Sequence, residues 1–270
     1  MFKMELKRAV CNYRMLFVVI LSLLLLYLSA YNTILSSSWF IDQKADDLSK
    51  ESIEKLFEFG KNKYHIWTQS YLYMQSLFIL IIILPYASSY VYEKQKGFHY
   101  FSMIRAGTRK YRMLKILSGS IAGGLALIVP ELLYYLGLSL IARNQLLHPF
   151  QLMPAGLFSD LFQTHPDLYI ILIIGIHFFL GVSYTAFAIG LTSFFSRTIY
   201  VYIIPFVFYL FYDIVISSTK SFAKYAITPV YNFMSSTGSH IYDHIMLFGV
   251  FIFFGLLLFY INYKWVLKHG

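Results

Sequence analysis

The chain has little charge and almost no cysteine. Charged residues make up 13% of its 270 positions, against roughly 25% in an average soluble domain. Hydrophobic residues make up 58%, and the mean hydropathy is +0.61. This composition excludes an ordinary soluble domain and indicates an integral membrane protein. Because Cys11 is the single cysteine, the chain cannot form an internal disulfide framework or a site built from several thiolates.

Several catalytic signatures are also missing. The sequence contains no G-x-x-x-x-G-K-[ST] phosphate loop, so the chain is not expected to hydrolyse ATP by itself. It has no H-E-x-x-H motif, no paired aspartates within an apolar segment and no Ser/His constellation. These absences disfavour a membrane enzyme such as an intramembrane protease. We expect no catalytic residue, no metal site and no cofactor in this chain.

Six apolar segments are long enough to cross a bilayer, which takes about 20 helical residues. We therefore predict an all-α membrane protein with one transmembrane domain over residues 1–270. The predicted spans are about 16–35, 70–92, 116–141, 168–195, 199–216 and 245–263. Pro85 is expected to bend the second span near its inner end. Gly119 and Gly123, spaced by four, predict close approach of a neighbouring helix to the third span.

The segments between the spans differ in character. Residues 1–14 alternate apolar and basic positions at helical spacing, which predicts a helix lying at the membrane interface. Residues 36–63 carry mixed charges and predict an extracytoplasmic helical loop. The last outer segment, 217–244, contains an apolar stretch from Tyr225 to Met234 that is suited to dip into the membrane without crossing it.

The basic residues fall mostly on one side of this topology. Of the 22 Lys and Arg residues, fourteen lie in the N-terminus, the 93–115 segment, Arg197 and the C-terminus, together with only two acids. The other eight are interleaved with most of the acidic residues. The positive-inside rule therefore places both termini and segment 93–115 in the cytoplasm. This sorting by membrane side accounts for the net charge of +9 without a nucleic-acid partner.

Segment 93–115 has the densest positive charge in the chain. It also contains Phe98, Phe101 and Ile104, which are spaced by three and fall along one side of a short helix. Such a helix, held between two spans and flanked by cations, has two natural uses. It can rest on anionic lipid headgroups, or it can dock into a soluble partner.

This arrangement resembles the ABC-2-type permease family, the membrane subunits of many bacterial exporters. The resemblance is carried by three features: six spans preceded by an interfacial helix, a final outer segment able to enter the membrane, and the sequence after span two. There, Glu93-Lys-x-x-Gly97 leads to a short apolar-faced helix and to basic residues from Arg109 to Lys115. His99-Tyr100 departs from the family pattern, in which a threonine is commoner.

The resemblance implies a cytoplasmic coupling helix after Gly97, which would sit in a cleft of a separate ATPase. The coupling residues would be Glu93, Gly97, Phe98, Phe101, Ile104 and Arg105, with Glu93 or Arg105 fixing the register at the rim. Two permease subunits, identical or homologous, would pair with two ATPase subunits that bind ATP and Mg²⁺. The location would be the bacterial cell membrane, and an amphipathic peptide is the favoured cargo.

Polar residues at membrane depth are candidates for a substrate pathway, because an intramembrane acid is costly and often functional. Glu131 in span three and Asp213 in span five should reach a similar depth in the outer half. His177 in span four is expected to be a packing residue. The pathway candidates, which include nearby tyrosines, are Glu131, Tyr134, Tyr135, Tyr209 and Asp213.

Two other functions stay open from the sequence. A proton-coupled secondary transporter would use Glu131 as its proton carrier and would need no ATPase. A structural or immunity membrane protein would sequester a molecule without transporting it.

Overall fold

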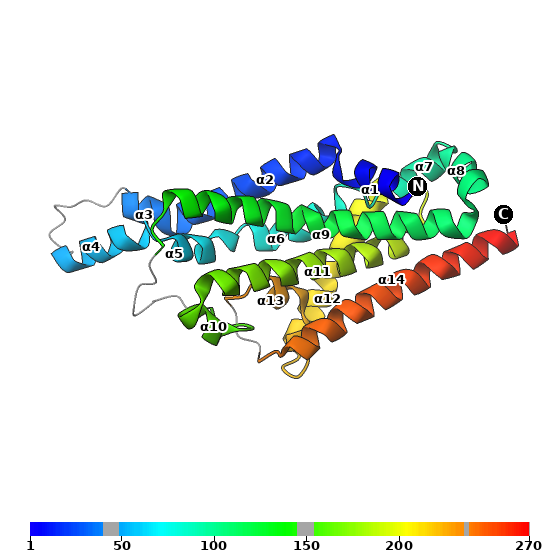
Figure 1. Ribbon diagram of the computed structural model, residues 1–270. Coiled ribbons are helices and arrows are strands. Elements are labelled where there is room, and N and C mark those ends of the chain that lie inside the picture. Colours follow the sequence, from blue (N-terminus) through cyan, green and yellow to red (C-terminus); the bar gives the residue numbers. More distant parts are fainter. Residues whose placement is uncertain (40–48, 145–153, 235–237, 270) are drawn as a thin grey trace.

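Two long helices, α9 (Thr108–Ile141) and α11 (Pro166–Thr192), lie side by side in the bundle of the computed structural model (Figure 1). The structure describes residues 1–39, 49–144, 154–234 and 238–269. Glycines let the two helices approach closely: a Cβ on Gly123 would lie 2.0 Å from Thr185 Oγ1, and one on Gly119 would lie 2.5 Å from Ile189 Cδ1. The small-residue spacing thus lies at the α9–α11 contact.

The remaining helices pack against this pair or extend from the ends of the bundle (Figure 1). In chain order they are α1 (Phe2–Val10), α2 (Tyr13–Ala30), η1 (Tyr31–Leu35), α3 (Ser36–Trp39), α4 (Lys50–Phe59), α5 (Lys63–Thr68), η2 (Gln69–Tyr71), α6 (Met74–Ile83), α7 (Ser89–Gln95), α8 (Phe98–Ala106), α10 (Ser159–Thr164), α12 (Ile199–Ser218), η3 (Ala223–Tyr225), α13 (Ile227–Tyr231) and α14 (Ile241–His269).

Five described helical segments are long and apolar enough to cross a membrane: Tyr13–Leu35, Thr108–Ile141, Pro166–Thr192, Ile199–Ser218 and Ile241–Trp265. Each overlaps a predicted span. The predicted third span began at 116, but α9 begins eight residues earlier and takes in part of the basic segment. The all-α membrane class is therefore supported, with a sixth span only if a bent pair of helices is counted as one.

The second predicted span is not a continuous helix. Lys63–Tyr71 and Met74–Ile83 meet at an angle of 71°. On the first of these helices, the Thr68 and Ser70 hydroxyls donate to the backbone carbonyls of His65 and Ile66. Such side-chain bonds to helix carbonyls tend to bend a helix. A second break follows at residues 84–88, where Pro85 lacks the N–H that a continuing helix needs.

The N-terminal helix α1 is shorter than the predicted 1–14 segment and ends at Val10. Asn12 then starts α2, because its side chain accepts a hydrogen bond of 2.9 Å from the backbone N–H of Met15. The face of α1 that packs inward carries Glu5 and Ala9, while Phe2 is exposed. The bundle thus buries Glu5 and Ala9 of this helix, and its interfacial position stays a prediction.

The segments at the far end of the bundle follow the predictions in part. In 36–63, residues 40–48 lie outside the described part of the chain, and α3 and α4 are helical on either side. In 217–244, residues 235–237 are likewise not described. The short helix α13 turns back into the bundle there, with Ile227 and Tyr231 completely buried.

Both chain termini lie at one end of the bundle, together with α1, α7 and α8 (Figure 1). We call this the terminal end. Helices α4 and α10 lie at the opposite end. The structure therefore places the basic segment, the N-terminus and the C-terminus together, as the predicted topology requires.

Candidate functional site

Helix α8 projects at the terminal end and is bounded by two glycines (Figure 1). Gly97 has φ 74° and Gly107 has φ 78°, in the left-handed region that disfavours other residues. These two turns reverse the chain on each side of a nine-residue helix. The sequence thus makes a short helix whose orientation is fixed at both ends.

The apolar residues of α8 divide between two directions. Met103 and Ala106 pack against the main hydrophobic core. Phe98, Phe101 and Ile104 are 57%, 69% and 83% exposed. Three large apolar side chains on one cation-flanked helix are thus mostly uncovered by the described part of the chain. Arg105 is exposed in the last turn of the same helix.

The resemblance implied that Glu93 or Arg105 lies at the rim of this helix, and Glu93 does not lie there. It is buried, and its carboxylate meets Lys115 Nζ at 2.7 Å, the Tyr111 hydroxyl at 2.7 Å and an Arg8 nitrogen at 3.2 Å. These partners come from α9 and α1. Glu93 therefore holds the base of α8 to the bundle, and Arg105 is left as the rim candidate.

Lys115 is the centre of this network, which we call the terminal-end cluster (Glu5, Arg8, Tyr86, Glu93, Tyr111 and Lys115). Its ammonium also lies 3.1 Å from Glu5 Oε2 and 3.1 Å from the Tyr86 hydroxyl. Burial by itself would raise the pKa of Glu5, but the hydrogen bond from Tyr86 and the charge of Lys115 together lower it. Three helical segments are joined by this cluster: α1, the α7 region and α9.

A neighbouring cation, Arg112, joins α9 to α14 and was not singled out from the sequence. Its guanidinium donates to the Tyr90 hydroxyl at 2.9 Å, to the Phe259 carbonyl at 2.8 Å and to Asn262 Oδ1 at 2.8 Å. The Phe259 ring lies 4.3 Å from the guanidinium carbon. The sequence grouped Arg112 and Lys115 with exposed loop cations, whereas both are buried.

The middle of the bundle contains a second buried group, which we call the central cluster (Glu131, His177 and Tyr231). Glu131 and His177 are both 0% exposed. Nδ1 of His177 lies 3.0 and 2.8 Å from the two carboxyl oxygens of Glu131. The Tyr231 hydroxyl donates to Glu131 Oε1 at 3.2 Å. Since Glu131 is completely buried, it does not face a water-filled route in this conformation.

The partners of His177 define how many protons this cluster holds. Nε2 of His177 lies 3.1 Å from the Tyr231 carbonyl, which can only accept, so Nε2 must carry a hydrogen. The contact between Nδ1 and Glu131 then requires one further proton, shared by an imidazole nitrogen and a carboxyl oxygen. Imidazolium with carboxylate and neutral imidazole with carboxylic acid both satisfy this geometry.

The remaining pathway candidates make local structural bonds. Asp213 accepts from the backbone N–H groups of Ile227 and Thr228 at 2.7 and 2.9 Å, which holds the start of α13. The Tyr209 hydroxyl bonds Thr228 at 2.6 Å. Both residues therefore anchor the returning segment, and neither meets Glu131 in the described hydrogen bonds.

Tyr134 and Tyr135 lie farther along α9. The Tyr135 hydroxyl bonds Asp167 and accepts from Lys63 at 3.3 Å, so it joins α9 to α5 and α11. Tyr134 bonds Ser70 at 2.8 Å and also lines a mostly apolar pocket of 570 Å³ beside α2. Tyr134 thus borders open space beside α2.

Comparison of the chain with protein families, with curated proteins and with solved structures gave no match.

Proposed function

We propose that this chain is the membrane subunit of an ABC-type exporter in a bacterial cell membrane, with both termini in the cytoplasm. The observation that carries the proposal is α8: a short helix, fixed by two left-handed glycines, that exposes Phe98, Phe101 and Ile104. Exposed apolar side chains ringed by cations suit the core and rim of a protein interface. The partner is a separate ATPase that binds ATP and Mg²⁺.

The contacts of α8 with the bundle support a role in transmitting movement. Helix α8 directly follows α7 in the chain. Glu93 of α7 is bonded to Lys115 on α9 and to Arg8 on α1. A shift of α8 caused by closure of the ATPase would act on these rigid helices. We propose a pair of such subunits, identical or homologous, and an amphipathic peptide as cargo.

The test is co-purification of the ATPase with the full-length chain from gently solubilised native membranes. We expect Phe98→Ala/Phe101→Ala to insert normally and to lose most of the ATPase. The matched control is Phe211→Ala/Phe253→Ala, which removes two phenylalanines of similar exposure, 69% and 60%, from α12 and α14. Equal ATPase recovery from the α8 variant and the wild type would overturn the proposal.

A second candidate function is proton-coupled transport, and the shared proton of the central cluster favours it. Such a transporter must release and regain that proton during its cycle, with Glu131 as carrier. It would run on a proton gradient in vesicles that contain this chain alone. Substrate uptake that collapses with an uncoupler and with Glu131→Gln would support this candidate, and uptake that requires an added ATPase would exclude it.

A further inference from the structure

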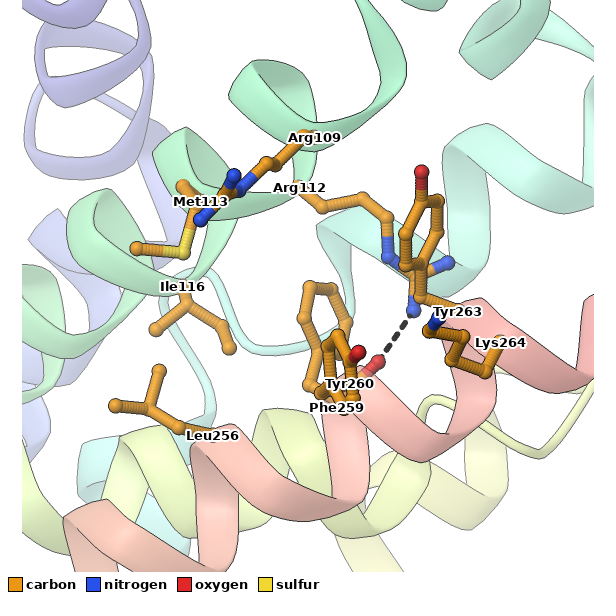
Figure 2. Close-up of a pocket in the computed structure, with 9 residues that line it drawn as sticks. All are labelled: Arg109, Arg112, Met113, Ile116, Leu256, Phe259, Tyr260, Tyr263 and Lys264. Atoms are coloured by element: carbon orange, nitrogen blue, oxygen red, sulfur yellow. Dashed lines mark hydrogen bonds between the residues drawn. The ribbon is translucent and has the colours of Figure 1, made fainter. Parts of the chain in front are cut away.

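A pocket of 490 Å³ opens between α9 and α14 at the terminal end of the bundle (Figure 2). Its volume is within the range of small-ligand sites, roughly 300–1,000 Å³. Arg109 and Arg112 come from α9, and Lys264 comes from α14. None of the nine described residues that line the pocket is acidic.

Arg112 gives this pocket a buried charge that has no acidic partner among its described hydrogen bonds. Its side chain is buried, and its described hydrogen-bond partners are all neutral: two side-chain oxygens and one carbonyl. Figure 2 shows the bond from Arg112 to the Phe259 carbonyl at the pocket wall. A buried cation is costly without a counter-charge, so an anion in the pocket would relieve this cost.

The rest of the pocket is apolar and aromatic. Met113 and Ile116 of α9 face Leu256 of α14, farther from the terminal end than the three cations. Tyr260 and Tyr263 border the basic part. Both helices are apolar enough to cross a membrane, so a pocket near their ends lies where headgroups meet acyl chains. Cations followed by an apolar wall match a molecule with a phosphate at one end and hydrocarbon at the other.

We propose that this pocket is a binding site for an anionic phospholipid of the adjacent leaflet. The phosphate would lie between Arg109, Arg112 and Lys264, and an acyl chain would extend along Ile116 and Leu256. Basic pockets between transmembrane helices are suited to such headgroups. The site is separate from α8, and the inference does not depend on the proposed ATPase partner.

The test uses the full-length chain in nanodiscs of phosphatidylcholine that contain an increasing fraction of phosphatidylglycerol. Bound phosphatidylglycerol is counted by native mass spectrometry after release from the discs. We expect Arg109→Gln/Lys264→Gln to weaken binding roughly 25-fold, about fivefold for each cation removed. Arg112 is left intact because it joins α9 to α14 and its loss could unfold the chain.

The matched control is Arg105→Gln/Lys110→Gln, which removes the same charge from exposed positions of segment 93–115 outside this pocket. We expect it to bind phosphatidylglycerol within twofold of the wild type. An equal loss of bound phosphatidylglycerol in both double variants would overturn the proposed site and would indicate unspecific attraction of the lipid to the basic surface. Retention of phosphatidylcholine equal to that of phosphatidylglycerol would also contradict a site for an anionic phospholipid. So would complete displacement of the bound phosphatidylglycerol by soluble glycerol 3-phosphate.

Discussion

At the terminal end, Lys115 lies between two glutamates, whereas in the middle of the bundle Glu131 lies against one histidine. The first cluster carries fixed charges: an ammonium, two carboxylates and a partly exposed guanidinium. The second is sealed, and its acid and base share a single proton. Fixed charges join helices strongly, while a shared proton lets a buried pair remain neutral overall. The first cluster is therefore suited to hold α8 in place, and the second to respond to a proton.

The largest effect should come from removing the centre of the terminal-end cluster. Lys115→Met leaves two buried carboxylates without their ammonium partner, and breaking a buried ion pair costs roughly 3–5 kcal/mol. We expect a clear fall in the free energy of unfolding, measured by urea denaturation in detergent micelles. A loss below about 1 kcal/mol would mean that Glu5 and Glu93 do not depend on Lys115.

Glu131→Gln should have a smaller effect than Lys115→Met. The amide can donate to Nδ1 of neutral His177 and accept from Tyr231, so the described contacts are kept and the expected cost is about 1 kcal/mol. Glu131→Leu is the contrast, because it leaves the Tyr231 hydroxyl and Nδ1 of His177 without their partner. In the same denaturation assay, the free energy of unfolding of Glu131→Leu should be well below that of Glu131→Gln. An equal loss of stability in the two variants would contradict the shared-proton geometry.

Acid should weaken the terminal-end cluster through Glu5. The pKa of Glu5 is lowered in the folded chain, so its stabilising contribution is complete above the usual value of 4.5 and is lost as pH falls below it through the folded pKa. The thermal unfolding temperature of the wild type should therefore drop in that acid range more steeply than that of Glu5→Gln. Parallel pH curves for both proteins would show that Glu5 does not carry the effect.

The smallest predicted effect is that of Tyr231→Phe. It removes one hydroxyl that donates to Glu131 at 3.2 Å, which should cost about 0.5 kcal/mol while the ring stacking on Phe78 is kept. Thermal unfolding of this variant beside Phe78→Leu separates the hydroxyl from the ring. If Tyr231→Phe were less stable than Phe78→Leu, the hydroxyl bond to Glu131 would contribute more to stability than the aromatic packing around it.

The apolar spans and the apolar side of α8 could be predicted from the sequence because both are local patterns. Hydropathy marks a span, and Phe98, Phe101 and Ile104 share a face at a spacing visible over seven residues. Even so, the second predicted span is not a continuous helix, because hydropathy does not report the 71° bend between Tyr71 and Met74.

The buried clusters could not be predicted because their members are far apart in the chain. Glu5 meets Lys115 across 110 residues, and Tyr231 meets Glu131 across 100. Glu131 and His177 were each visible as polar residues inside apolar spans, but their pairing depends on the packing of α9 against α11. Lys115 and Arg112 resembled loop cations because they lie in a dense run of positive charge, and a local charge pattern does not show which cations a contact with a distant helix buries.

The most direct measurement is photo-crosslinking from α8 in intact native membranes. A photoreactive residue replaces Ile104, the most exposed apolar position of this helix at 83%, and another replaces Phe211 on α12 as the control. Our account predicts that Ile104 crosslinks to a protein carrying a G-x-x-x-x-G-K-[ST] phosphate loop and that Phe211 does not. Crosslinks from Ile104 to lipid alone would contradict it and would make α8 a membrane-surface helix.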